Sequence, residues 1–298
     1  MSHEPRTADA RRLQTRQLTL AIALSAATLL IEVAGGLLSG SLALLSDAGH
    51  VLTEVLALVL SLMAVRFGSL PATPAKSYGY HRLEILTALL NGALLVAISA
   101  GILYKAVRRL MSPAPIESSV MIGVALLGLL ANLAGVALLS RAPQNLNLRG
   151  ARMHAIGDAC SSVGVLAAGG IIALTGWERL DAILGGAIAL IIAVGSVRLV
   201  REAVDVLLEA TPKGIDLDDV SRAIAALPGV IEVHDLHIWS ITTGLPALSG
   251  HVRLDGAPLG AGDDMLNRIK ETVRDRFGIV HTTIQIESRS YVELGDVH

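Results

Sequence analysis

Residues 41–66 read SLALLSDAGHVLTEVLALVLSLMAVR, an apolar run that is interrupted by Asp47, His50 and Glu54. The run is longer than the roughly 20 helical residues that cross the hydrocarbon core of a bilayer. An ionisable side chain at the centre of such a span costs about 2.5–3.5 kcal/mol on insertion scales, and it commonly marks a functional site. The stretch therefore predicts a membrane helix that contains part of a functional site.

The composition of the whole chain agrees with a membrane protein. Of its 298 residues, 52% are hydrophobic and 17% are charged, which is too apolar for a water-exposed globular protein of this size. The formal net charge is −2 and the Lys and Arg residues lie in short loops, so no nucleic-acid partner is expected. Cys160 is the single cysteine, so the fold does not depend on an intrachain disulfide.

Five further apolar stretches have nearly bilayer-spanning length, and Gly, Ser, Pro or polar residues separate them. The first span follows four arginines, but it is too long for the apolar region of a secretory signal. The sequence predicts a polytopic α-helical membrane protein with six transmembrane helices. The predicted spans are about 18–38, 41–66, 83–104, 119–140, 151–175 and 182–203.

Lys and Arg are more frequent beside the spans on the N-terminal side of the membrane than on the other side, where Lys105, Arg108, Arg109 and Arg179 lie. This asymmetry predicts that both termini are cytoplasmic. We expect a cytoplasmic N-terminal segment at 1–17, a transmembrane domain at 18–207 and a cytoplasmic domain at 208–298. The short loops and compact size are compatible with a bacterial inner membrane.

After about residue 207 the chain has the composition of a soluble domain, with charges interleaved among apolar positions. A stretch of this length can fold by itself. Its periodicity predicts the order α-β-β-α-β, an α+β arrangement close to a ferredoxin-like fold. The predicted elements are 216–227, 230–241, 247–254, 262–277 and 279–287.

Two of the predicted spans each contain a His followed four residues later by a carboxylate: His50 with Glu54, and His154 with Asp158. Four residues return almost to the same face of a helix, one turn along, so each pair can present both side chains to one point. Two imidazoles and two carboxylates from facing helices form a tetrahedral ligand set suited to zinc. The sequence therefore predicts an intramembrane metal site.

Other interpretations of these residues are open. A single polar side chain can simply bond a neighbouring helix, but four ionisable groups need a compensating partner, which a cation supplies. An intramembrane zinc enzyme needs an open coordination position and a general base, and no His-Glu-x-x-His motif is present. A membrane-anchored metal sensor, in which the helices only anchor a metal-binding tail, is a further alternative.

Metal binding requires neutral imidazole and ionised carboxylate, so metal ions and protons compete for the same groups. If the helices open alternately to either side, an inward proton gradient drives metal outward. The sequence is thus interpreted as a secondary active transporter that exchanges divalent metal for protons, and not as an enzyme.

Five motifs carry a family resemblance that runs over nearly the whole chain. They are SDAGH at 46–50, SYGYHRLE at 77–84, HAIGD at 154–158 followed by SSVG at 161–164, VHDLHIW at 233–239 and HTTIQ at 281–285. In these motifs and their order the chain resembles the cation diffusion facilitator family, most closely its zinc-transporting branch.

The resemblance implies a homodimer whose cytoplasmic tails pair, and export of zinc, with cadmium or cobalt as alternatives, by metal/proton antiport. It places the transport site on His50, Glu54, His154 and Asp158, with zinc as the cargo and no other cofactor. The family usually has Asp where Glu54 stands, so the additional methylene puts the selectivity among these metals in question. Many relatives carry a His-rich loop between the fourth and fifth spans, whereas residues 141–152 contain no histidine.

For the tail, the same resemblance suggests a regulatory metal site from His234, His251 and Glu287, with Gln285 as a further candidate. Surface histidines without a metal are an equally good interpretation. The resemblance also suggests an ion pair between Arg82 and Glu209 that joins the membrane part to the tail.

Four polar residues within the spans remain ambiguous. Asp47 is three residues before His50, so it is either an acceptor or proton relay behind the metal ligands or a bonding partner for another helix. Glu32, Asn91 and Asn132 either line a cavity or bond between helices, and the second is favoured.

Overall fold

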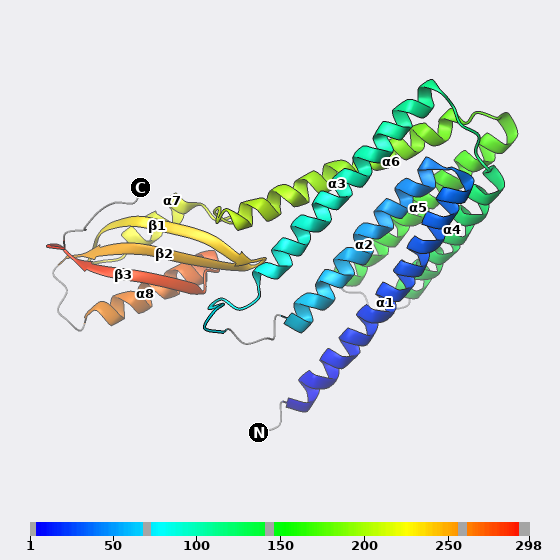
Figure 1. Ribbon diagram of the computed structural model, residues 1–298. Helices are drawn as coiled ribbons and strands as arrows, with labels where there is room; N and C mark the ends of the chain where they lie inside the picture. The colour runs from blue at the N-terminus through cyan, green and yellow to red at the C-terminus, as the bar shows by residue number, and fades with distance from the viewer. Residues whose placement is uncertain (1–3, 68–72, 141–145, 256–260, 292–298) are drawn as a thin grey trace. The chain divides into compact units, whose positions relative to one another are not determined.

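The computed structural model describes residues 4–67, 73–140, 146–255 and 261–291. The chain divides into two compact units. One comprises Met1–Ser69 with Thr87–Val200, and the other comprises Leu70–Leu86 with Arg201–His298. The first unit is helical, and the second contains a small sheet (Figure 1).

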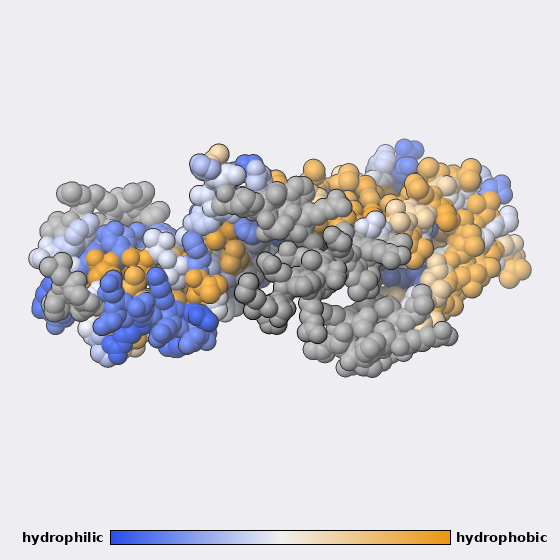
Figure 2. Space-filling model, turned by 90° about the horizontal axis from the view of Figure 1, so that it is seen from below, coloured by the Kyte–Doolittle hydropathy of each residue, from blue (hydrophilic) through white to orange (hydrophobic). Residues whose placement is uncertain are grey.

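Within the described ranges, six helices are long and apolar enough to cross a membrane, which confirms the predicted number of spans. The first helix begins well before residue 18, and its apolar window is Ile22–Ser39. Hydrophobic residues gather over these helices in the space-filling view (Figure 2). The bounds are α1 Glu4–Ser39, α2 Leu42–Phe67, α3 Arg82–Met111, α4 Ser118–Ser140, α5 Leu146–Thr175 and α6 Arg179–Leu207.

Glycines allow close approach between the helices. A Cβ atom at Gly36 would lie 2.8 Å from the side chain of Leu45, so α1 packs tightly on α2. A Cβ atom at Gly185 would lie 2.6 Å from the backbone of Leu42, so α6 touches the start of α2. Buried apolar side chains of α2, α4 and α5 form the core of the bundle: Ala43, Leu44, Met121, Ala125, Val165, Ala168 and Ile172.

The first turn of α2 is held by Asp181 of α6, which is fully buried. Its carboxylate accepts hydrogen bonds from Ser41 Oγ at 2.5 Å, from the Leu42 amide at 2.7 Å and from the Ala43 amide at 3.1 Å. Backbone N–H groups at a helix start have no partner within the helix, so an acceptor from another helix replaces the usual cap. Arg109 of α3 lies 3.5 Å from the same carboxylate. This network was not predicted from the sequence.

The second unit confirms the predicted order α-β-β-α-β. Strands β1 (Val230–Thr242), β2 (Leu245–Leu254) and β3 (His281–Ser288) form one sheet in the order β1-β2-β3. β1 and β2 are antiparallel, whereas β2 and β3 are parallel. The helices α7 (Leu217–Ala225) and α8 (Ala261–Phe277) pack on each other and against this sheet.

The core of this unit lies between the sheet and the two helices. Its fully buried side chains include Val220 of α7, Leu248 of β2 and Ile269 of α8. At the start of α7, Asp216 accepts hydrogen bonds from the amides of Asp218 and Asp219, the arrangement that N-cap aspartates favour. On the face of this unit that Figure 2 shows, hydrophilic residues surround smaller hydrophobic patches.

The second unit includes the segment that leads into α3. Nη2 of Arg82 lies 2.7 Å from Oε1 of Glu209, and the hydroxyl of Thr242 donates to Oε2 of Glu84 at 2.9 Å. Both partners in the first pair are more than one-third exposed, so that ion pair contributes only about 0–1 kcal/mol to stability.

Candidate metal centre and the cavities around it

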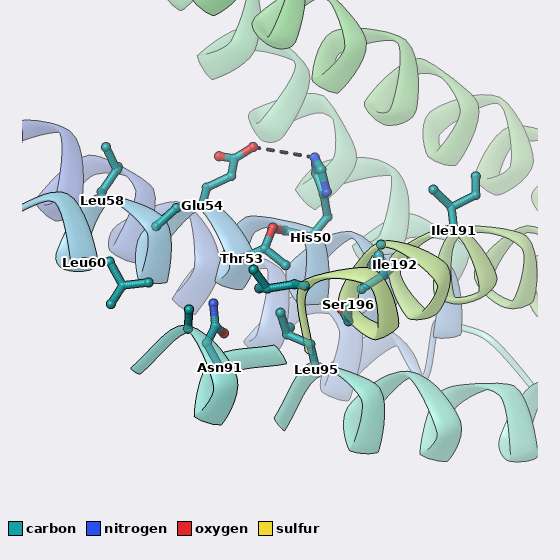
Figure 3. Close-up of a pocket in the computed structure, with 14 residues that line it drawn as sticks. His50, Thr53, Glu54, Leu58, Leu60, Asn91, Leu95, Ile191, Ile192 and Ser196 are labelled. Carbon is teal, nitrogen blue, oxygen red and sulfur yellow. Dashed lines mark hydrogen bonds and ion pairs between the residues drawn. The ribbon is translucent and has the colours of Figure 1, made fainter. Parts of the chain in front are cut away.

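Three of the four predicted intramembrane ligands converge. Nε2 of His50 lies 3.5 Å from Oε1 of Glu54 on the same helix and 3.2 Å from Oδ1 of Asp158 on α5. All three ligand atoms lie within 4.8 Å of one another. Figure 3 shows the Glu54 carboxylate turned toward the imidazole of His50.

The spacing of these atoms fits a zinc-sized ion. Zn–N and Zn–O bonds of about 2.0–2.1 Å at a tetrahedral angle place neighbouring ligand atoms about 3.3 Å apart. The two distances from His50 are 3.2 and 3.5 Å, close to that value before any adjustment of side chains. One imidazole and two carboxylates also suit the borderline character of zinc. The described residues thus supply three of the four positions of a tetrahedral shell.

The register between α2 and α5 indicates the place of the fourth predicted ligand. His50 lies beside Asp158, and one turn away Ser161 donates a hydrogen bond to Asp47 at 2.9 Å. The two helices are therefore antiparallel at this contact, and Glu54 is level with position 154 of the α5 backbone. The side chain of His154 lies outside the described residues.

Two cavities meet at this centre, and both His50 and Glu54 line each of them. The larger cavity has a volume of about 710 Å³ and lies between α2, α3 and α6 (Figure 3). Its walls are mostly apolar, with Asn91 and Ser196 among the few polar side chains. The smaller cavity has a volume of about 150 Å³ and lies between α1, α2, α4 and α5. A cation at the centre thus has open space on two sides.

The ambiguous polar residues have different surroundings. Asn132 of α4 donates to Ser162 of α5 at 3.3 Å, which is an interhelical hydrogen bond, although Asn132 also lines the smaller cavity. Asp47 is buried and bonded to Ser161. Glu32 and Asn91 are buried, and among the described residues neither Oε2 of Glu32 nor Oδ1 of Asn91 has a hydrogen-bond partner.

The tail contains a second cluster of possible ligands, one on each strand. Nδ1 of His251 lies 3.0 Å from Oε1 of Glu287, and Nε2 of His234 lies 3.4 Å from Oε2 of the same carboxylate. The three ligand atoms lie within 4.8 Å of one another, and the two imidazole rings meet edge to face with centroids 5.3 Å apart. Sheet register explains the convergence, because His234 is paired with His251 across β1 and β2.

Two neighbouring side chains contact the carboxylate that this cluster would offer to a metal. Glu287 is 2% exposed, and its carboxylate also lies 3.6 Å from Nη2 of Arg253. Gln285 donates to Oε1 of Glu287 at 3.0 Å, so its amide nitrogen binds the carboxylate and only its oxygen is a candidate ligand. Two imidazoles and one buried carboxylate match a zinc ligand set with one position open. The residues fit the ion, although Arg253 competes with it for the carboxylate.

Sequence patterns missed several residues that shape these sites. Asp235 has a positive φ of 48° at a β-bulge and lies 3.8 Å from Nε2 of His251. Ser161 and Arg253 were also missed as partners of the buried carboxylates Asp47 and Glu287, and Asp181 was missed as the buried carboxylate at the start of α2. An acidic residue directly at the start of a membrane helix, as at Asp181, is a usable signal, but a cross-strand Arg has no local signature.

Comparison with known families agrees with both parts of the chain. Residues 18–208 match the family described as the cation efflux transmembrane domain. Residues 212–289 match the family described as the cytoplasmic domain of cation efflux proteins.

Curated relatives match over most of their own length. The metal cation efflux system protein CzcD of Cupriavidus metallidurans is 41% identical over 91% of this chain and 86% of that protein. The zinc transporter ZitB of Escherichia coli K12 is 38% identical over 96% of this chain and 90% of its own length. A cadmium, cobalt and zinc/H(+)-K(+) antiporter of Bacillus subtilis is 36% identical over 88% of this chain and 86% of that protein.

A solved structure titled as the metal-bound C-terminal domain of the CzcD transporter is 42% identical. It covers 24% of this chain and 99% of its own, with a TM-score of 0.23. The two family matches and the relatives' high coverage agree with the motifs and with the six apolar helices. The chain is a multi-pass membrane protein and belongs to the cation diffusion facilitator family of metal cation efflux transporters.

Proposed function

We propose that this protein exports divalent metal ions, with zinc preferred, by metal/proton antiport. The observation that carries the proposal is the convergence of His50, Glu54 and Asp158 from two membrane helices, with ligand atoms within 4.8 Å of one another. The second His–carboxylate pair, completed by His154, supplies the fourth ligand in this proposal. A closed shell of four protein ligands favours a carried ion over a catalytic zinc, which needs an open position for water.

The coupling to protons follows from the ligand types. Protons and metal ions exclude each other from imidazole and carboxylate, so release of metal on one side is linked to uptake of protons there. Both cavities extend from His50 and Glu54 toward the same end of α2, the end near Phe67, which is the cytoplasmic end in the proposed orientation. They support entry of the metal ion from the cytoplasm, the first half of an alternating-access cycle. The name of the Bacillus subtilis relative describes it as an antiporter of metal against H⁺ and K⁺.

We propose cytoplasmic termini, a bacterial inner membrane and a homodimer. The excess of Lys and Arg on the N-terminal side supports the orientation. Two of the basic residues on the opposite side are bonded within the protein: Arg109 donates to the Gly40 carbonyl, and Arg179 donates to the Leu110 carbonyl at 3.0 Å. Because Arg109 and Arg179 make these hydrogen bonds within the protein, their position has a structural explanation. They therefore count less against cytoplasmic termini than unbonded cations at the same positions would. The family of the tail is named for dimerisation, which supports pairing of two chains.

The test is a flux assay with the full chain in proteoliposomes. Zinc, cadmium, cobalt, manganese and iron compete in pairs, and an imposed pH gradient is the only driving force. We expect zinc flux that follows the pH gradient and vanishes when the gradient is collapsed by an ionophore. Flux that ignores the imposed gradient would refute the proton coupling, and preference for another metal would refute zinc as the main cargo.

His50→Ala and His154→Ala provide the site control. Each removes one imidazole from the proposed shell, so we expect zinc flux to fall at least about tenfold, which corresponds to about 1.4 kcal/mol. His237→Ala, in the exposed part of β1, is the matched histidine substitution and leaves flux unchanged. Equal flux in wild type and His50→Ala would contradict the proposed site.

We further propose that the tail cluster of His234, His251 and Glu287 binds zinc as a regulator. This cluster is also the observation that favours the sensor as a second candidate function. A full-length His234→Ala/His251→Ala variant separates the two. As a transporter, that variant keeps the flux through the membrane site, although its response to zinc concentration shifts. A sensor whose helices only anchor the tail shows no flux in wild type.

A further inference from the structure

The lining of the smaller cavity beside the membrane centre contains more carboxylates than one divalent ion neutralises when all of them are ionised. Its lining contains four carboxylates, and among the described lining residues there is no Lys or Arg. Glu54 and Asp158 belong to the proposed transport site, and a divalent cation there neutralises both. Glu32 and Asp47 remain, both buried, in surroundings where an uncompensated charge is strongly unfavourable.

Glu32 faces this cavity with an unsatisfied oxygen. Its side chain is 4% exposed, and Oε2 has no hydrogen-bond partner among the described residues. The carboxylate lies against Gly128 of α4, because Oε1 is 3.4 Å from the place that a Cβ atom of Gly128 would occupy. The absence of a side chain at Gly128 thus leaves room for the carboxylate next to α4.

The helix register places Glu32 and Asp47 together near the metal centre. α1 and α2 run antiparallel, and Gly36 lies beside Leu45, so Glu32, one turn back along α1, is level with about residue 49. Asp47 lies three residues before His50 on α2, on the side nearer the connection between α1 and α2. Both carboxylates therefore lie beside the centre or between it and that connection.

The cavity also has room for a partly hydrated ion. Its volume of about 150 Å³ exceeds the roughly 30 Å³ that one water occupies in the liquid. The hydroxyls of Thr28 and Ser25 add oxygen atoms to the part of its wall that lies one and two turns from Glu32 toward the start of α1. Oxygen ligands with several waters suit transient binding of a divalent cation, whereas the imidazole-containing centre suits tighter binding.

We propose that Glu32 and Asp47 form a second, transient binding station for the exported divalent cation, adjacent to the centre at His50. The ion leaves the His–carboxylate shell for these two carboxylates and their waters, which lie at the end of the cavity nearer the α1–α2 connection. The station rests on the proposed function, since it serves an ion that passes through the membrane site. In this scheme Glu32 acts on the rate of ion release and not on the affinity of the central shell.

The test compares wild type, Glu32→Gln and Glu32→Asp as full chains in proteoliposomes, with zinc as the probe. Glu117→Gln, which removes an exposed carboxylate in the segment before α4, is the control. Zinc affinity of the central site is measured by competition with a chromophoric chelator, in a background that carries His234→Ala and His251→Ala.

For Glu32→Gln we expect maximal zinc flux to fall about tenfold, while the KM for zinc and the central-site affinity change less than about twofold. Glu32→Asp keeps the charge and restores a substantial part of the flux, which a packing defect would not predict. Glu117→Gln transports like wild type.

Three results would overturn the station. They are wild-type flux in Glu32→Gln, a loss of central-site affinity as large as that in Asp158→Asn, or a lower ratio of protons to zinc, which would make Glu32 a proton carrier. Each of these results is compatible with zinc transport by the wild-type protein, so none of them refutes the proposed function. Absence of zinc flux in wild type would instead refute the proposed function itself.

Discussion

Nε2 of His50 on α2 and Oδ1 of Asp158 on α5 lie 3.2 Å apart, although 108 residues separate them in the chain. This contact joins the two membrane helices that carry the His–carboxylate pairs. The side chain of Asp158 is 18% exposed and that of His50 is 36% exposed, so the pair is accessible to an ion while lying largely inside the bundle. Substitutions on either side of the contact therefore report on metal binding more than on folding.

Asp158→Asn removes one negative charge and keeps the shape of the side chain. We expect zinc affinity of the full-length protein to fall at least about tenfold, because a neutral amide oxygen binds a dication less strongly than a carboxylate does. Chelator competition in detergent measures the change. Asp264→Asn, an exposed substitution on α8, is the matched control and keeps wild-type affinity. Equal affinities for both variants would rule out Asp158 as a ligand.

Glu54→Asp tests whether the additional methylene sets metal selectivity. Oε1 of Glu54 reaches to 3.5 Å from Nε2 of His50, and shortening the side chain withdraws it by roughly 1.5 Å, one C–C bond. The longer Glu54 side chain has one more rotatable bond with which to move its oxygen and keep its bond to a larger ion. We therefore expect wild type to tolerate cadmium better than the variant, with the cadmium-to-zinc flux ratio changing about threefold or more. Paired competition flux measures that ratio. An unchanged ratio would show that the length of this side chain does not set selectivity.

Asp181→Ala tests the buried network at the start of α2. Three donors lose their acceptor, and Arg109 loses its charged neighbour, so we expect a loss of stability of about 3–5 kcal/mol. Thermal unfolding in detergent measures the effect. Ser46→Ala removes only one hydroxyl bond, to the Gly185 carbonyl, and costs about 1 kcal/mol. Equal unfolding temperatures for the two variants would contradict the network's importance.

Zinc should stabilise the sheet of the tail through its three clustered ligands. At a zinc concentration of 100 times Kd, binding to the folded state stabilises it by about 2.7 kcal/mol. Amide hydrogen exchange of β1–β3 peptides in the full-length protein measures this protection, which a chelator removes. His251→Ala abolishes the zinc-dependent protection, whereas His237→Ala, which lies next to Asp235, retains it. Zinc-dependent protection that survives in His251→Ala would place the metal elsewhere.

The six spans and the order of the tail elements followed from local patterns. Apolar length predicts a span, and alternation or a 3.6-residue period predicts a strand or a helix, because each property is set within a few neighbouring residues. The pairing of His50 with Glu54 also followed, since residues four apart share a helix face. The same rule predicted His154 with Asp158 on one face, and this remains a prediction because the His154 side chain lies outside the described residues.

The sequence by itself thus determined the spans, the fold of the tail and the identity of most candidate ligands. Tertiary structure alone decided that Asp181 would cap α2 from another helix and that Arg253 would face Glu287. It also decided that Oε2 of Glu32 would lie beside an acidic cavity with no hydrogen-bond partner among the described residues. These relationships depend on which helices and strands become neighbours, and on glycines that allow backbones to approach. Contacts of that kind join residues far apart in the chain, so no local period encodes them.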